Sequence, residues 1–165
     1  MKVIFLDVDG VLNTSKTNSN ILDIDSFRLE YLKAIIDETD AKIVLSSSWV
    51  KFFTKVNNKI IPRSEKGFLF YNLLNLYSIE IYDILGTGIN REEMIIDWIS
   101  KNEVDSFIII DDEPNMFNKL LDRLIKTSIV KDNQMLTNMD DCIGLCYYHI
   151  EIAKNMLKTK VKVKK

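Results

Sequence analysis

The chain has 165 residues, of which 47% are hydrophobic and 28% are charged, and its formal net charge at pH 7 is −2. These values lie close to the averages of globular proteins and predict one enzyme-sized domain. The longest aliphatic or aromatic runs have only four residues, which excludes an apolar membrane span of 18 or more residues, so we expect a cytoplasmic protein without a membrane segment.

The chain begins with a short apolar run that ends at two carboxylates. Residues 3–6 predict a buried parallel strand, and Asp7, Asp9 and Gly10 follow at its carboxyl end, where open α/β sheets place their chemistry. In extended backbone the two carboxylates would point to the same side, and Gly10 would let the chain turn tightly. An ordinary Asx turn is the alternative interpretation of the same residues.

Helices and strands alternate along the rest of the chain. A polar loop over 13–20 precedes a helix for which we expect Ser26 to be the N-cap, and Thr137 with Asp140 resembles a capping box for the last helix. The expected elements after the first strand are, in chain order, a helix over 26–38, a strand over 42–46, a helix over 64–76, a strand over 79–85, a helix over 91–99, a strand over 106–110, a helix over 115–124, a strand over 127–130 and a helix over 137–157.

This alternation predicts an α/β fold, with a doubly wound, parallel, five-stranded Rossmann-like sheet and helices on both of its faces. We expect residues 1–157 to form this single domain and residues 158–165 to form a Lys-rich tail. Trp49 and Trp98 are expected to pack against the sheet.

A second pair of carboxylates, Asp111 and Asp112, follows the apolar run over 107–110. If the two strands are neighbours, this pair meets Asp7 and Asp9 at one edge of the sheet. Two unit charges about 4 Å apart repel by roughly 1 kcal/mol in water and by about 4 kcal/mol at an effective dielectric constant of 20. A hard divalent cation removes that cost, and oxygen ligands without a nearby His or Cys favour Mg²⁺.

Four motifs of this chain resemble, in their order along the sequence, those of the haloacid dehalogenase (HAD) superfamily. Members of that superfamily transfer phosphoryl groups through an aspartate nucleophile. The matching positions are Asp7 to Gly10 for the Asp-x-Asp-Gly motif, Ser46 at the end of a strand, Arg91 at the start of a helix, and Asp111 with Asp112 after a strand. A smaller set is similar to the compact HAD domains of RNA-repair proteins of the Swiss Army Knife type, namely Ser47, Ser48 and Trp49, the helix over 91–99, and Leu136 with Thr137.

The resemblance implies a magnesium-dependent phosphatase that works through an aspartyl-phosphate. In that scheme Asp7 is the nucleophile, and Asp9 first protonates the leaving oxygen and then takes a proton from water. Ser46, through its hydroxyl and backbone N–H, would bind a phosphate oxygen, with Ser47 as the neighbouring candidate, while Arg91 supplies positive charge. The implied Mg²⁺ ligands are Asp7, the carbonyl of Asp9, and one or both of Asp111 and Asp112.

Three positions depart from the family pattern, one of them Met135, which stands where the compact relatives have Gly before Leu-Thr, and several alternatives stay open. Arg91 stands where the superfamily usually has Lys, and Lys101 and Lys66 are reserve candidates for that role. Relatives carry a basic residue directly after the Trp of the second motif, whereas here Lys51 comes one position later. The alternative functions are a catalytically weak or inactive HAD-fold scaffold and a protein phosphatase. A receiver-type signalling domain fits less well, because its acidic motifs occur in another order.

The spacing of the motifs also bears on the substrate. One predicted helix and one predicted strand take up most of each segment between the first three motifs, so no large cap domain is expected. An open site would suit a phosphate on a polynucleotide, a nucleotide or a peptide. The Lys-rich tail over 158–165 is a second pointer to nucleic acid, although a solvated terminus explains it equally well. No obligate protein partner is expected.

Overall fold

A computed structural model of the chain describes residues 1–13, 22, 24–86, 88, 90–127 and 143–160. Its centre is a five-stranded parallel sheet with the order β5-β2-β1-β6-β7. The strands are β1 (Lys2–Leu6), β2 (Lys42–Leu45), β5 (Ile81–Ile84), β6 (Ser106–Asp111) and β7 (Leu124–Lys126). The predicted α/β class, the parallel sheet and its number of strands are confirmed.

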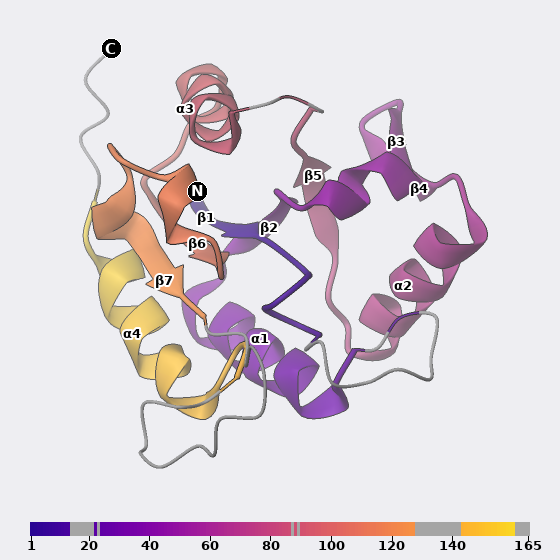
Figure 1. Cartoon of the computed structure of the whole chain (residues 1–165), viewed down its shortest axis with the longest axis horizontal. Helices are drawn as coiled ribbons and strands as arrows, with labels where there is room; N and C mark the ends of the chain where they lie inside the picture. The colour runs from indigo at the N-terminus through magenta and orange to yellow at the C-terminus, as the bar shows by residue number, and fades with distance from the viewer. Residues whose placement is uncertain (14–21, 23, 87, 89, 128–142, 161–165) are drawn as a thin grey trace.

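Helices cover both faces of the sheet, as the alternation of elements predicts (Figure 1). Ile4 and Leu6 of β1 belong to the core that α1 and α4 cover, whereas Val3 and Phe5 point into a second core under α3. The first strand is buried on both sides because helices cover it from both sides. The helices are α1 (Ser26–Thr39), α2 (Glu65–Leu76), α3 (Arg91–Lys101) and α4 (Tyr147–Lys158).

A small β-hairpin that the sequence analysis does not predict lies beyond β5. After the 3₁₀ helix η1 (Ser48–Phe52), β3 (Phe53–Val56) pairs with β4 (Lys59–Pro62) in antiparallel register. The turn residues Asn57 and Asn58 have φ angles of 49° and 60°, as a two-residue type I′ turn requires, so the Asn-Asn pair was an available signal. The insertion is far smaller than a domain, and the described residues contain no large cap, as expected.

The predicted helix over 115–124 is wrong. The structure has two single 3₁₀ turns there, η2 (Pro114–Met116) and η3 (Leu121–Arg123), and the fifth strand, β7, comes earlier than predicted. The cause is Glu92 on α3, whose carboxylate accepts hydrogen bonds from the backbone N–H groups of Asn118 (2.8 Å) and Leu120 (2.9 Å). An N–H that donates to Glu92 cannot donate to a carbonyl one helical turn earlier.

We expect Glu92→Ala to lower the free energy of unfolding by about 2–4 kcal/mol, since two partly buried N–H groups lose an ionised acceptor. Burial opposes ionisation of Glu92, but these N–H donors outweigh it and lower the carboxyl pKa. Urea unfolding at pH 7 measures the loss. The matched control is Glu93→Ala, because Glu93 is exposed on the same helical turn and should cost under about 0.5 kcal/mol. Equal losses in the two variants would contradict this account.

The last helix begins later than predicted. Residues 143–146 are not helical, because Gly144 has a φ of 66° and the N–H of Leu145 donates to the carbonyl of Val11 at 2.8 Å. Arg28, buried on α1, donates to the carbonyls of Ile143 and Leu145, the latter at 3.0 Å. These bonds fasten the segment before α4 to the loop that follows β1.

The helix starts differ in detail from the predicted caps. The N-cap of α1 is Asp25 rather than Ser26, and its carboxylate accepts from Arg28 Nε at 2.8 Å. The predicted capping box of Thr137 and Asp140, like Leu136, lies outside the described residues, as does most of the polar loop over 13–20. None of the described helices has both the length and the hydropathy to cross a membrane.

Candidate active site

The carboxyl ends of the three central strands bring the polar motifs to one edge of the sheet. Asp7 follows β1, Ser46 follows β2, and Asp111 is the last residue of β6. The ladder continues into these residues, since the N–H of Asp7 donates to the carbonyl of Ile110 (3.0 Å) and that of Ser46 to the carbonyl of Leu6 (2.8 Å). The first and last motifs, far apart in sequence, therefore lie on adjacent strands.

Three carboxylates form a cluster at this edge. Asp7, Asp111 and Asp112 each place one oxygen so that all three oxygens lie within 4.8 Å of one another. Asp7 and Asp111 are buried and Asp112 is half-buried. Hard oxygen ligands at this spacing, with no His or Cys in the cluster, fit a magnesium-type cation.

Burial makes the cluster costly to ionise. It raises the pKa of Asp7 from its ordinary value of 3.8 to about 7; the Arg91 charge opposes this rise, and the Asp111 charge adds to it. Burial also raises the pKa of Asp111, again against Arg91, and raises that of Asp112, where the Asp111 charge adds to the effect. Such carboxyl groups gain most from a nearby positive charge.

Arg91 provides one such charge from the first turn of α3. Its Nη1 donates to Asp111 Oδ2 and lies 3.7 Å from Asp7 Oδ1. The helix start is fixed by Asn90, whose side chain caps it by accepting from the N–H of Glu93 at 3.1 Å. Of the two reserve candidates, Lys101 pairs with Asp97 at 2.6 Å, and Lys66 lies over the ring of Trp49.

Asp9 does not join the three carboxylates, contrary to the expectation that it would lie beside Asp7. Gly10, with a φ of 75°, turns the chain, and the exposed Asp9 side chain accepts hydrogen bonds from Trp49 Nε1 and Asn13 Nδ2, both at 2.9 Å. The sequence places Trp49 in a family motif and predicts that it packs against the sheet, but it indicates no contact with Asp9 and no role for Asn13. The role proposed for Asp9 in metal binding involves its backbone carbonyl and stays a prediction.

The two serines after β2 are buried, and they differ in their partners. The Ser46 hydroxyl has no hydrogen-bond partner among the described residues, whereas Ser47 Oγ accepts from the N–H of Trp49 at 3.2 Å. A hydrogen bond from the Ser47 side chain also acts to lower the pKa of Asp7. The backbone N–H of Ser46 donates to Leu6, so only its hydroxyl, and not its N–H as predicted, is free to bind a ligand.

A cavity of about 270 Å³ opens beside these groups. Small residues and two cations give it room and positive charge, which suits an anionic ligand. Lys51, on η1, lies on its wall with Ser46, Ser47 and Arg91, although it is one position later than the basic residue of the family pattern. The remaining lining residues are Ser48, Val50, Leu85, Gly86, Gly88, Met94 and Met116.

Comparison with known proteins gives one family match. A family model described as the HAD domain in Swiss Army Knife RNA repair proteins matches residues 3–131. This range contains the three clustered carboxylates, both serines, Asp9 and Arg91. No curated protein and no solved structure matches the chain significantly.

Proposed function

The chain belongs to the family of HAD domains found in Swiss Army Knife RNA repair proteins, and from this premise we propose that it is a magnesium-dependent phosphomonoesterase. Membership in this family points to a phosphatase-type hydrolase. The observation that carries the finer proposal is the cluster of Asp7, Asp111 and Asp112 beside Arg91 and the unpartnered hydroxyl of Ser46.

The proposed reaction has two displacements at phosphorus. A carboxylate oxygen of Asp7 forms a bond to phosphorus while the bond to the leaving oxygen breaks, and that oxygen takes the proton of Asp9. Asp9 then takes a proton from a water molecule while the oxygen of that water attacks phosphorus. The bond between phosphorus and Asp7 breaks, and inorganic phosphate leaves. Arg91 and the Ser46 hydroxyl hold phosphate oxygens during both steps, with Ser47 as the neighbouring donor.

Mg²⁺ would be held by the side chains of Asp7, Asp111 and Asp112 together with the carbonyl of Asp9. Bound there, it supplies positive charge that offsets the repulsion among the carboxylates and the charge of the phosphate. The carboxylate spacing within 4.8 Å and the oxygen-only donor set support this assignment.

For the substrate, we propose a phosphate at the end of a polynucleotide or on a nucleotide. The absence of a large cap among the described elements, the Lys51 and Arg91 side chains at the cavity and the family's association with RNA repair support this class. A phosphate on a protein is the second candidate, because the same open site would admit it. The third candidate is a scaffold without turnover, for which the replacement of the usual Lys by Arg91 is the supporting feature.

The test is metal-dependent phosphate release from a panel of substrates. The purified chain is incubated with Mg²⁺ and a generic aryl phosphate, 3′- and 5′-phosphorylated oligonucleotides, mononucleotides and a phosphopeptide. We expect turnover that EDTA abolishes, the highest kcat/KM on an oligonucleotide or nucleotide, and a melting temperature about 5–10 °C higher at 100 times the Kd for Mg²⁺. A folded protein that releases no phosphate from any substrate would favour the scaffold.

A further inference from the structure

The Asp9 carboxylate is exposed, yet both of its oxygens are held. Trp49 Nε1 donates to Oδ2 and Asn13 Nδ2 donates to Oδ1, each at 2.9 Å. Asn13 is in turn fixed through its own oxygen, which accepts from the N–H of Gly10 at 3.1 Å. An exposed aspartate side chain normally rotates freely, so two donors on opposite oxygens restrict it to one orientation.

The donor on Trp49 is itself rigid. Trp49 is 2% exposed and packs edge-on against Phe52 and Phe70, with ring centroids 5.8 and 5.1 Å away. The ammonium of Lys66 lies 4.0 Å from the centre of its ring. The indole is therefore held from several sides, and its N–H presents a fixed point to the carboxylate.

From these contacts we propose that Trp49 is a positioning residue for the acid of the reaction, and that with Asn13 it holds the Asp9 carboxyl group in the orientation in which it protonates the leaving oxygen. The inference rests on the proposed function, because it requires Asp9 to act as that acid. A fixed orientation matters for general acid catalysis, since the proton must lie within hydrogen-bond reach of the leaving oxygen.

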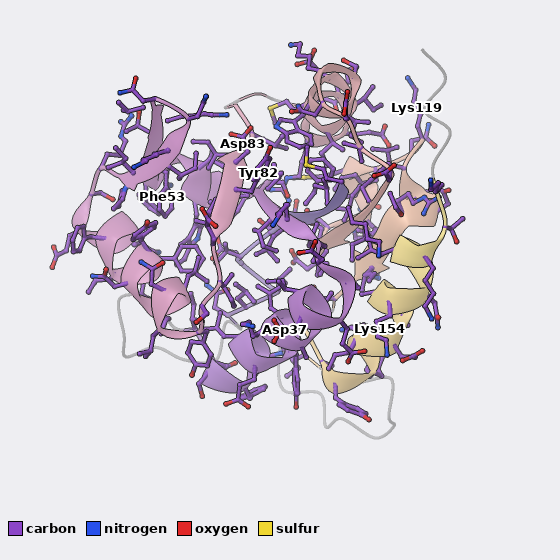
Figure 2. All side chains as sticks on the ribbon, turned by 180° about the vertical axis from the view of Figure 1, so that it is seen from behind. Asp37, Phe53, Tyr82, Asp83, Lys119 and Lys154 are labelled. Carbon is purple, nitrogen blue, oxygen red and sulfur yellow. The ribbon has the colours of Figure 1, made fainter. Side chains whose placement is uncertain are left out.

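A second tryptophan in the chain allows a purely structural role of the bond from Trp49 to Asp9 to be distinguished from a role in positioning the acid. The other tryptophan, Trp98, also donates its indole N–H to a carboxylate, Asp83 Oδ2, at 2.9 Å. Asp83, labelled in Figure 2, is buried on β5, and its other oxygen pairs with Lys55 at 2.8 Å. Trp98→Phe therefore removes the same kind of bond at a place where no acid of the reaction is held.

The experiment measures how kcat/KM depends on the leaving group of the phosphate ester. A nitrophenolate leaves readily without a proton, whereas an alkoxide does not, so loss of the acid slows alkyl phosphates more than 4-nitrophenyl phosphate. The value of kcat/KM depends only on the steps up to departure of the leaving group. It therefore reports the protonation of the leaving oxygen by Asp9 and not the later step in which Asp9 takes a proton from water. A general acid contributes about 10²–10⁴-fold, and its misplacement should forfeit part of that.

The experiment measures kcat/KM of wild type, Trp49→Phe, Asn13→Ala and Trp98→Phe on 4-nitrophenyl phosphate and on an alkyl phosphate, with Mg²⁺ present. Phenylalanine keeps an aromatic ring at position 49 and removes the N–H. We expect Trp49→Phe to lose about 10-fold or more on the alkyl phosphate and under about threefold on 4-nitrophenyl phosphate. Asn13→Ala should shift the ratio in the same direction, and Trp98→Phe should leave it unchanged.

The outcomes distinguish failure of the positioning role of Trp49 from failure of the proposed phosphatase activity. If a folded Trp49→Phe protein loses the same factor of kcat/KM on both substrates, or loses none, the positioning role is wrong, and the proposed phosphatase activity is unaffected. If Trp49→Phe does not fold, the ratio in Asn13→Ala decides in the same way. The 5′-phosphorylated oligonucleotide, which is itself an alkyl phosphate, is the alkyl substrate where a simpler ester is not hydrolysed, and a wild-type protein that releases phosphate from no substrate of the panel would overturn the proposed function and this inference with it.

Discussion

Replacing Asp7 with asparagine is expected to abolish phosphate release and, at the same time, to stabilise the metal-free protein at neutral pH. Asp7 is the nucleophile of the proposed mechanism, so turnover should vanish on every substrate. The carboxylate of Asp7 is buried beside that of Asp111, and burial raises its pKa to about 7. The rise of the pKa of Asp7 from 3.8 to about 7 corresponds to about 4 kcal/mol, so we expect a gain in the free energy of unfolding of about 2–4 kcal/mol and a melting temperature about 5–10 °C higher at pH 8 in EDTA.

The sign of this effect fixes its pH dependence. The pKa of Asp7 in the folded state lies above its unfolded value of 3.8, so the folded state binds the proton more tightly. The carboxyl group therefore costs little below about pH 3, where both states are protonated, and its cost grows between about pH 4 and pH 7. The difference in melting temperature between Asp7→Asn and wild type should be largest at about pH 8 and should shrink steadily as the pH falls toward about 4.

Asp97→Asn is the matched control, since Asp97 is an exposed carboxylate on α3 that pairs with Lys101. Its melting temperature should follow that of wild type at every pH, within the small effect of a surface ion pair. Two results would contradict this account: an Asp7→Asn protein less stable than wild type at pH 8, or a stability difference that does not change with pH. Either would show that the ionised Asp7 carboxylate does not destabilise the metal-free folded protein.

Removing the positive charge of Arg91 should have the opposite effect on stability. Arg91→Met keeps most of the side-chain volume but leaves Asp111 buried without its ion-pair partner and Asp7 without a nearby cation. Breaking a buried pair in this way costs about 3–5 kcal/mol. Since the proposed mechanism also places Arg91 against the charge that develops on the phosphate, kcat should fall by about 10²–10³-fold. Urea unfolding at pH 8 in EDTA and initial rates with Mg²⁺ measure the two losses.

Arg91→Lys tests whether position 91 needs only a charge. Lysine is the residue that the superfamily usually has there, so we expect this variant to recover most of the stability and at least a tenth of the wild-type rate. Lys101→Met on the exposed end of α3 serves as the control and should change neither quantity. If Arg91→Met kept wild-type turnover, Arg91 would be a structural partner of Asp111 and nothing more.

The sheet and most of the site could be predicted because both depend on local patterns. Apolar runs bounded by polar residues predict buried parallel strands, and parallel strands bring their carboxyl ends to one edge. That rule predicts Asp7 and Asp111 at one edge of the sheet, and the two residues meet there because β1 and β6 are neighbours. Ser46 and Arg91 could be assigned to the same site only through the resemblance to the HAD superfamily.

The parts that were missed depend on single contacts between distant residues. Glu92 draws the backbone of Asn118 and Leu120 away from the helix that their sequence favours, and nothing near those two residues indicates it. The bond from Trp49 to Asp9 likewise joins η1 to the turn after β1. The hairpin over 53–62 is the exception, because the Asn-Asn turn between two alternating segments was a local signal.

The hydrogen bonds from Arg28 to the segment before α4, here called the Arg28 clasp, affect the order in which the protein can fold during synthesis. Arg28 binds the carbonyls of Ile143 and Leu145, and Leu145 in turn binds the carbonyl of Val11 in the loop that carries Asp9. The matched family segment stops at residue 131, before this clasp. The loop that carries Asp9 can therefore take up these bonds only after residues 143–145, which follow it by more than a hundred positions, have been synthesised.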